Sequence, residues 1–189
     1  MNVANRMNAL KPSDIREVMK MIAANPGTIS FAGGLPDPKL FPGEAMRRAT
    51  DKVLREQAEA ALQYGLTLGY VPLRQKIAGL MAREGVVTGV DNIAITTGSQ
   101  QAISLSALLF LNAGEVVLTE NPSYLGALTA FKTFETDYIS VDSDEVGMKP
   151  EDLEAKLVAH PEAKLIYVIP NFQNPTGRTW SLERRQALV

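Results

Sequence analysis

A short polar loop near the C-terminal end of the chain carries the clearest chemical signal. Residues 171–177 directly follow the apolar run 164–170, which has the length and β-branched content of a buried parallel strand. Open α/β sheets bind ligands at the carboxyl ends of their strands, so the side-chain amide of Asn174 is well placed to hydrogen-bond a ligand there. Residues 174–177, taken alone, are equally compatible with a simple turn.

A second segment, residues 96–101, is expected to join a strand to the first turn of a helix. Gly98 permits the tight turn. Ser99 and Gln100 then offer unpaired backbone N–H groups, where the helix dipole adds positive potential, and Ser99 also offers a hydroxyl. These features predict a phosphate-binding site; a helix cap without a ligand is the alternative. The segment is neither a GxGxxG fingerprint nor a P-loop, which disfavours a dinucleotide or ATP site.

Four further residues are candidates for contacts with a ligand. Tyr124 follows the expected strand 116–120 and could stack on a flat ring, although a core tyrosine is the alternative. Tyr64 lies in a Gly-rich polar loop, from which its hydroxyl could reach a phosphate or cross a subunit interface. Gly34 permits close approach of the backbone to a ligand. Arg16 lies on the polar side of an expected helix, where an arginine is ordinarily only solvated.

The elements that must position these residues alternate between strands and helices from residue 92 onward. We expect strands at 92–97, 116–120, 136–141 and 164–170, and helices at 99–112, 122–133 and 150–160. Such alternation predicts an α/β fold with a mostly parallel sheet and helices on both faces. Upstream, helices are expected at 13–25, 43–59 and 72–84, with a Gly- and Pro-rich segment at 32–38.

Composition restricts the class of protein. Hydrophobic residues make up 46% and charged residues 21%, and the formal net charge of −2 does not suggest a nucleic-acid surface. The absence of cysteine excludes disulfides and thiolate metal sites. The single histidine, His160, argues against a histidine metal site, and we expect no metal. The sequence contains no apolar run of membrane-spanning length and no signal-peptide core, so we expect a soluble cytoplasmic protein.

The last residues begin a helical pattern that does not continue. Ser181 is a good N-cap residue and Glu183 lies in the expected first turn, but the chain stops at Val189. Because a domain rarely ends within its first two helical turns, we expect the chain to be truncated.

Five segments, in order, carry a resemblance to a known family. They read SFAGGLPDPKLFP (30–42), LQYGLTLGYVPLR (62–74), ITTGSQQAI (95–103), VVLTENPSYLGAL (116–128) and YVIPNFQNPTGRTWSLERR (167–185). Together they resemble fold-type I, pyridoxal-phosphate (PLP)-dependent aminotransferases of class I/II. The resemblance is greatest to the 2-aminoadipate/kynurenine aminotransferase group, which also supplies the C-terminal domain of the MocR-type regulators.

The resemblance implies a three-layer PLP-transferase-like large domain with a mostly parallel, incomplete sheet, preceded by an N-terminal arm and helix. Residues 1–42 would form the arm, helix and substrate loop, and residues 43–189 the PLP-binding large domain, truncated at Val189. Family members are much longer than this chain. Their Schiff-base lysine is expected beyond Val189, so no catalytic residue is assigned here and the chain is expected to be inactive alone.

The family also implies roles for the candidate residues. Ser99 and Gln100 would hold the cofactor phosphate, Tyr124 would stack on the pyridine ring, and Asn174 would bond the phenolic oxygen of the ring. Tyr64 would reach the phosphate or substrate of the neighbouring subunit, which implies a homodimer.

Contacts with the substrate are implied for Gly34, through its backbone, and for Tyr64, Tyr124 and Asn174. Arg16 matches an arginine that contacts substrate in this group and could read a side-chain carboxylate. The family also often has cis peptide bonds before prolines, and Asn121-Pro122 and Asn174-Pro175 are the candidates.

The implied reaction moves an amino group between an amino acid (2-aminoadipate, glutamate, aromatic or similar) and a 2-oxo acid. One alternative is a non-catalytic effector-sensing domain of the MocR type, against which counts the lack of a basic helix-turn-helix ahead of the arm. A related PLP lyase or synthase is the other alternative, because these motifs bind the cofactor without selecting the reaction.

Overall fold

The computed structural model describes residues 2–4, 6–7, 14–25, 27–29 and 34–189, with only the backbone described for 14–16. The chain forms two compact units, residues 12–95 and residues 1–11 with 96–189, and each is described by itself. Among the described residues, no helix is both long enough and apolar enough to cross a membrane.

The unit of residues 12–95 is built from helices. They are α1 (Asp14–Ala24), η2 (Pro38–Leu40), α2 (Gly43–Glu56), α3 (Ala58–Leu62), α4 (Val71–Arg83) and η3 (Val90–Asn92). Arg74 of α4 is buried, and its guanidinium donates to Ile93 O at 2.9 Å and to Val90 O at 2.7 Å. These two bonds hold η3 and the chain that follows it against α4.

The prediction of a strand at residues 92–97 is wrong. Residues 90–92 form the 3-10 helix η3, and the extended chain after it belongs to no described strand. Ile95 N donates to Leu68 O at 3.0 Å, in the loop before α4. A Cβ at Gly69 would lie 2.5 Å from Ile95 Cγ1, so this close approach requires glycine. A segment whose sequence favours extended backbone becomes a strand only where another strand pairs with it. Here Ile95 is hydrogen-bonded to the loop before α4 and not to a strand.

The other unit contains the sheet. Its strands are β1 (Val116–Asn121), β2 (Asp137–Asp144), β3 (Gly147–Met148) and β4 (Leu165–Tyr167), in the order β3-β2-β1-β4. β1 is parallel to both β2 and β4, whereas β3 is antiparallel to β2. The helices are α5 (Gly98–Phe110), α6 (Leu125–Thr133), α7 (Pro150–Ala159) and α8 (Leu182–Leu188). The predicted α/β fold with a mostly parallel sheet is therefore confirmed.

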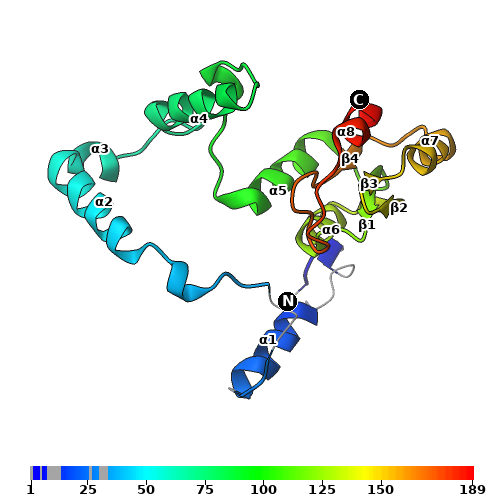
Figure 1. Cartoon of the computed structure of the whole chain (residues 1–189), viewed down its shortest axis with the longest axis horizontal. Coiled ribbons are helices and arrows are strands. Elements are labelled where there is room, and N and C mark those ends of the chain that lie inside the picture. Colours follow the sequence, from blue (N-terminus) through cyan, green and yellow to red (C-terminus); the bar gives the residue numbers. More distant parts are fainter. Residues whose placement is uncertain (1, 5, 8–13, 26, 30–33) are drawn as a thin grey trace. The chain divides into compact units, whose positions relative to one another are not determined.

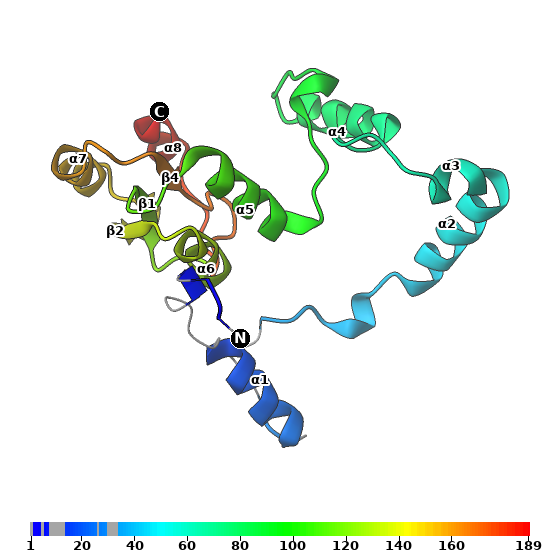
Figure 2. The ribbon, with the colours of Figure 1, turned by 180° about the vertical axis from the view of Figure 1, so that it is seen from behind.

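Side chains of β1 alternate between two apolar clusters, one on each face of the sheet. Val117 packs with residues of α5 and α6, including Ala107 and Phe131. Val116 and Leu118 pack with residues beyond the other face, including Leu153 of α7 and Trp180. Figures 1 and 2 show α5 and α7 on opposite sides of the sheet. This arrangement is the three-layer order expected for a sheet covered on both faces.

Glu120 follows the same alternation as Val116 and Leu118, so its carboxylate enters the apolar cluster that contains Trp180. Only 2% of Glu120 is exposed. One carboxylate oxygen accepts from the indole N–H of Trp180 at 2.9 Å, and the other accepts from the backbone N–H of Ile169 at 2.7 Å. Burial raises the pKa of this carboxyl above its ordinary value of 4.5, against the lowering effect of these donors.

An apolar cleft of about 280 Å³ lies between α5 and β4. Its lining residues are Ala102, Ile103, Ser106, Phe131, Leu165, Ile166 and Tyr167. Within the described residues β4 pairs only with β1, so its other edge carries unpaired backbone groups beside this cleft.

We predict that the cleft binds an apolar dye such as anilinonaphthalene sulfonate. Replacing Ile166 by Lys places a charge on the free edge and should lower dye fluorescence and aggregation of the chain. The matched control is Val158→Lys, because Val158 is exposed on α7 and does not line the cleft. Equal dye fluorescence from both variants and the unchanged chain would contradict this assignment.

The buried Glu120 carboxyl predicts a pH-dependent stability. Because its folded-state pKa is raised, the stabilising contribution is complete below the unfolded pKa and is lost as pH rises through the folded value. We therefore expect the free energy of unfolding to fall as pH rises above 4.5, the ordinary pKa of this carboxyl, and to fall less steeply in Glu120→Gln. Urea titrations followed by the fluorescence of Trp180, the only tryptophan of the chain, measure this slope.

The matched control for that slope is Glu154→Gln, because Glu154 is exposed on α7. Its pH slope should equal that of the unchanged chain. A Glu120→Gln slope equal to the control slope would show that Glu120 does not carry the effect.

Candidate functional site

Tyr124 stands at the junction between β1 and α6. It is the N-cap residue of α6, which begins at Leu125 rather than at the expected residue 122. The phenol ring lies over the first turn of the helix, since a Cβ at Gly126 would approach Tyr124 Cζ to 2.4 Å. Tyr124 is half-buried and packs against the apolar cluster of α5 and α6. The residue therefore keeps part of its surface accessible, as a stacking residue requires.

The N-terminus of α5 lies beside this ring. The helix begins at Gly98, whose φ is +78°, and no side chain of Thr97 caps it. Ser99 and Gln100 are both exposed. The Gln100 side-chain amide donates to Gly126 O at 2.9 Å, so it connects the first turns of α5 and α6. The backbone N–H of Thr97 donates to the Gln101 side chain and that of Gly98 donates to Thr96 O. The backbone N–H groups of Ser99 and Gln100 and the Ser99 hydroxyl are left as the candidate donors to an anion.

Asn174 is exposed in a closed loop that follows β4. Trp180 N donates to Pro170 O at 2.8 Å and Gln173 N donates to Arg178 O at 2.7 Å, so the two sides of the loop are hydrogen-bonded to each other. Arg185 of α8 also donates to Pro170 O, at 2.9 Å. The Asn174-Pro175 and Asn121-Pro122 bonds are both cis, as predicted.

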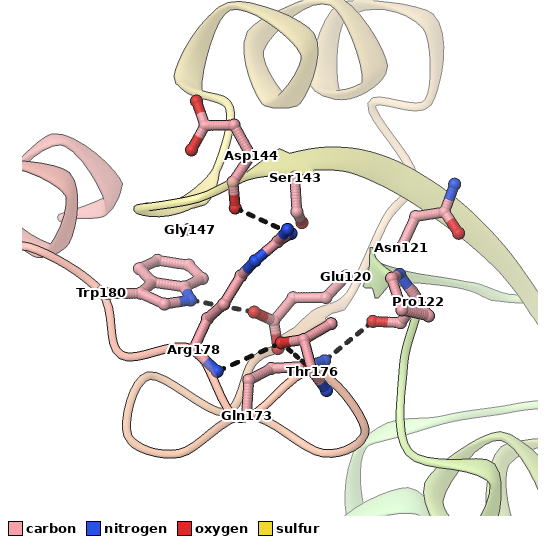
Figure 3. Close-up of a pocket in the computed structure, with 10 residues that line it drawn as sticks. All are labelled: Glu120, Asn121, Pro122, Ser143, Asp144, Gly147, Gln173, Thr176, Arg178 and Trp180. Atoms are coloured by element: carbon pink, nitrogen blue, oxygen red, sulfur yellow. Dashed lines mark hydrogen bonds between the residues drawn. The ribbon is translucent and has the colours of Figure 1, made fainter.

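Gln173 connects this loop to the one that carries Tyr124. Its side chain is 4% exposed, and its amide nitrogen donates to Pro122 O at 2.8 Å. Its amide oxygen accepts from Thr176 N at 2.9 Å and from Thr176 Oγ1 at 2.7 Å. Figure 3 shows Gln173 between Thr176 and Pro122, with Glu120 and Trp180 in the same cluster. The residues before Asn174 and before Ser123-Tyr124 are thus in direct contact.

The structure brings the predicted residues together only in part. Ser99, Gln100 and Tyr124 are neighbours, and Gln173 attaches the Asn174 loop to the Tyr124 loop. Tyr64 and Gly34 belong to the unit of residues 12–95.

In that unit Tyr64 is 99% exposed and Gly34 has φ of +55°. The backbone of Arg16 lies in α1, but its side chain lies outside the described residues. Their predicted roles stay predictions.

Sequence reasoning missed Glu120, Gln173 and Trp180, which hold the loops in place. A signal for Glu120 exists in the sequence, because it shares the alternation of Val116 and Leu118 and thus the buried face of the strand. Gln173 and Trp180 carry no comparable local pattern, since their partners lie 51 and 60 residues away in the chain.

The chemistry of this edge fits a phosphorylated aromatic compound. Helix N–H groups and a hydroxyl suit a phosphate, the accessible side of the Tyr124 ring suits a flat ring, and an exposed amide suits a ring oxygen. Gly126 is needed for the ring to lie where it does. Residues Ser99, Gln100, Tyr124 and Asn174 are therefore the candidate contacts for such a compound.

Proteins of known sequence resemble nearly the whole chain. It is 40% identical over 185 residues to "Aromatic-amino-acid aminotransferase 1" of Thermococcus litoralis, covering 95% of this chain and 44% of that protein. It is 42% identical over 180 residues to "2-aminoadipate transaminase" of Thermus thermophilus, with the same two coverages. It is 32% identical over 172 residues to "Uncharacterized HTH-type transcriptional regulator YdcR" of Escherichia coli, covering 90% of this chain and 36% of that one.

Solved structures agree with these relatives. A kynurenine aminotransferase of Pyrococcus horikoshii, in complex with PMP, superposes with a TM-score of 0.89 at 39% identity and covers 98% of this chain and 47% of its own. The α-aminoadipate aminotransferase LysN of Thermus thermophilus, complexed with N-(5'-phosphopyridoxyl)-L-leucine, gives 0.83 at 41% identity, covering 98% and 45%.

The chain spans about half the length of the aminotransferases that it matches. The family described as aminotransferase class I and II matches residues 33–189, which include the turn at Gly98, Tyr124 and the Asn174 loop. This chain belongs to the class I and II aminotransferases.

Proposed function

We propose that this chain supplies the phosphate and ring contacts of a PLP-dependent aminotransferase. The observation that carries the proposal is the first turn of α5, where Ser99 is exposed and Gln100 is hydrogen-bonded to the helix turn beneath Tyr124. The enzyme moves an amino group between an amino acid and a 2-oxo acid.

Each residue has a distinct task in this proposal. The backbone N–H groups of Ser99 and Gln100 and the Ser99 hydroxyl bind the phosphate, and the Tyr124 ring fixes the plane of the cofactor. The Asn174 amide donates to the phenolic oxygen and stabilises its ionised form. PLP, when bound, supplies the electron sink that makes the Cα–H bond of an amino acid acidic. The lysine that holds the cofactor and moves the proton is proposed to lie beyond Val189, as the resemblance implies.

The substrate and the assembly are also proposals. The names of the relatives favour 2-aminoadipate, glutamate or an aromatic amino acid as donor. Arg16 would bind a side-chain carboxylate, and the Gly34 backbone would lie against the substrate. We further propose a cytoplasmic homodimer in which Tyr64 serves the neighbouring site; the full exposure of Tyr64 supports that role.

A second candidate function is a non-catalytic effector-sensing domain. The likeness to the transcriptional regulator YdcR favours it. Both functions require the same phosphate and ring contacts, so ligand binding does not discriminate between them. Amino-group transfer by the whole protein does, because a sensor would bind the cofactor without turnover. A PLP lyase or synthase would instead release a different product from the amino acid.

We predict that Ser99→Ala weakens binding of pyridoxamine 5'-phosphate about tenfold, because a hydrogen bond to a charged phosphate is lost. A fluorescence titration of the chain measures the affinity. The matched control is Ser106→Ala, which removes a hydroxyl from an exposed position farther along the same helix. Unchanged affinity in Ser99→Ala, or an equal loss in Ser106→Ala, would contradict the phosphate role.

We also predict that borohydride treatment of the chain with PLP leaves no stoichiometric adduct on one lysine, and that the chain alone does not transaminate. Intact mass and peptide mapping provide the measurement. The lysines to inspect are Lys132, Lys149, Lys156 and Lys164. Lys132 lies 3.7 Å from Asp137 and Lys164 lies 4.0 Å from Glu115, which are surface ion pairs. A single fully modified lysine, or turnover, would refute the prediction.

A further inference from the structure

The loop that carries Asn174 is attached to the end of β1 at two places. At its base, Glu120 accepts from Ile169 N and from the Trp180 indole. Nearer its tip, the Gln173 amide donates to Pro122 O at 2.8 Å. The base attachment holds the loop to the sheet, whereas the second one reaches the segment that leads into Tyr124.

The Gln173–Pro122 bond makes a short path between the two candidate ligand contacts. Gln173 immediately precedes Asn174, and Pro122 is followed by Ser123 and Tyr124. The bond is shielded from water, because Gln173 is buried. The other end of the same amide accepts twice from Thr176, which fixes the turn around Asn174. One side chain therefore determines both the shape of the loop tip and its distance from Pro122.

We propose that Gln173 is a positioning residue that sets the separation between the Asn174 amide and the Tyr124 ring. The proposal rests on the proposed function, in which these two groups contact the same ring. Gln173 does not touch the ligand itself. Its effect should therefore be confined to binding of the ring, whereas the phosphate donors of α5 keep their own attachment through Gln100 and Gly126.

The substitution Gln173→Glu removes the donor to Pro122 O, and it also places a second carboxylate beside Glu120, whose pKa the Gln173 amide lowers. The new carboxylate can still accept from Thr176, but it presents an oxygen to Pro122 O where an N–H group stood, so the attractive contact becomes repulsive. Gln173→Met removes the bond without adding a charge beside Glu120, so it is measured together with Gln173→Glu, and a loss of affinity that both variants share is assigned to the Pro122 contact. The matched control is Gln186→Glu, which makes the same chemical change at an exposed position of α8.

The experiment compares two probes, pyridoxamine 5'-phosphate and inorganic phosphate, by titration of each variant. We expect Gln173→Glu to lose about tenfold in affinity for the first and to keep the affinity for the second. The emission maximum of Trp180 should stay unchanged, which shows that the base of the loop is intact. Gln186→Glu should match the unchanged chain for both probes.

Two outcomes overturn the positioning role while leaving the proposed function in place. One is equal affinity of Gln173→Glu and the unchanged chain for pyridoxamine 5'-phosphate. The other is an equal loss of affinity for pyridoxamine 5'-phosphate and for inorganic phosphate, which indicates a general structural defect.

Failure of the unchanged chain to bind pyridoxamine 5'-phosphate would instead contradict the proposed function. Hydrogen exchange of the backbone amides of residues 171–177 then tests whether Gln173 positions the loop. Faster exchange in Gln173→Glu than in Gln186→Glu supports positioning, and equal exchange overturns it.

Discussion

A buried carboxylate at the end of the central strand determines how this edge of the sheet is built. Removing a carboxyl group from water is unfavourable unless hydrogen-bond partners replace the lost hydration. Glu120 obtains those donors from Ile169 and Trp180, on either side of the Asn174 loop. If the loop moved away from the strand, the carboxylate would lose both partners. The loop base is therefore held by its hydrogen bonds to the buried Glu120 carboxyl as well as by its own backbone bonds.

This constraint explains how exposed residues can occupy defined positions. Asn174, Ser99 and Gln100 are all exposed, and exposed loops are ordinarily the most mobile parts of a domain. Here the residues next to them are buried or hydrogen-bonded to distant segments, as Gln173 is to Pro122. Binding groups held by such neighbours lose less conformational freedom when a ligand arrives.

The sequence alone predicted the helix start at Gly98 and the loop at Asn174 better than the contacts that hold them in place. The turn at Gly98 and the loop at Asn174 have local signals, because turn and helix-start residues determine their backbone directly. The strand expected at 92–97 failed because strand formation depends on a partner that no local pattern specifies. Arg74, Gln173 and Trp180 were missed for the same reason, since burial of a polar side chain depends on donors and acceptors far along the chain.

The crowding of Gly126 by the Tyr124 ring has a consequence for how such a chain can change over evolutionary time. Gly126 is helical, so nothing in its backbone demands glycine; only the neighbouring ring excludes a side chain. The residues that can be accepted at one of these two positions therefore depend on the residue present at the other. A larger residue becomes tolerable at 126 only after the aromatic at 124 has been lost, whereas the aromatic could be restored only after glycine had returned. Relatives that have lost the aromatic residue at 124 should thus tolerate residues larger than glycine at 126. Once such a residue is present, a return to tyrosine at 124 requires glycine at 126 first.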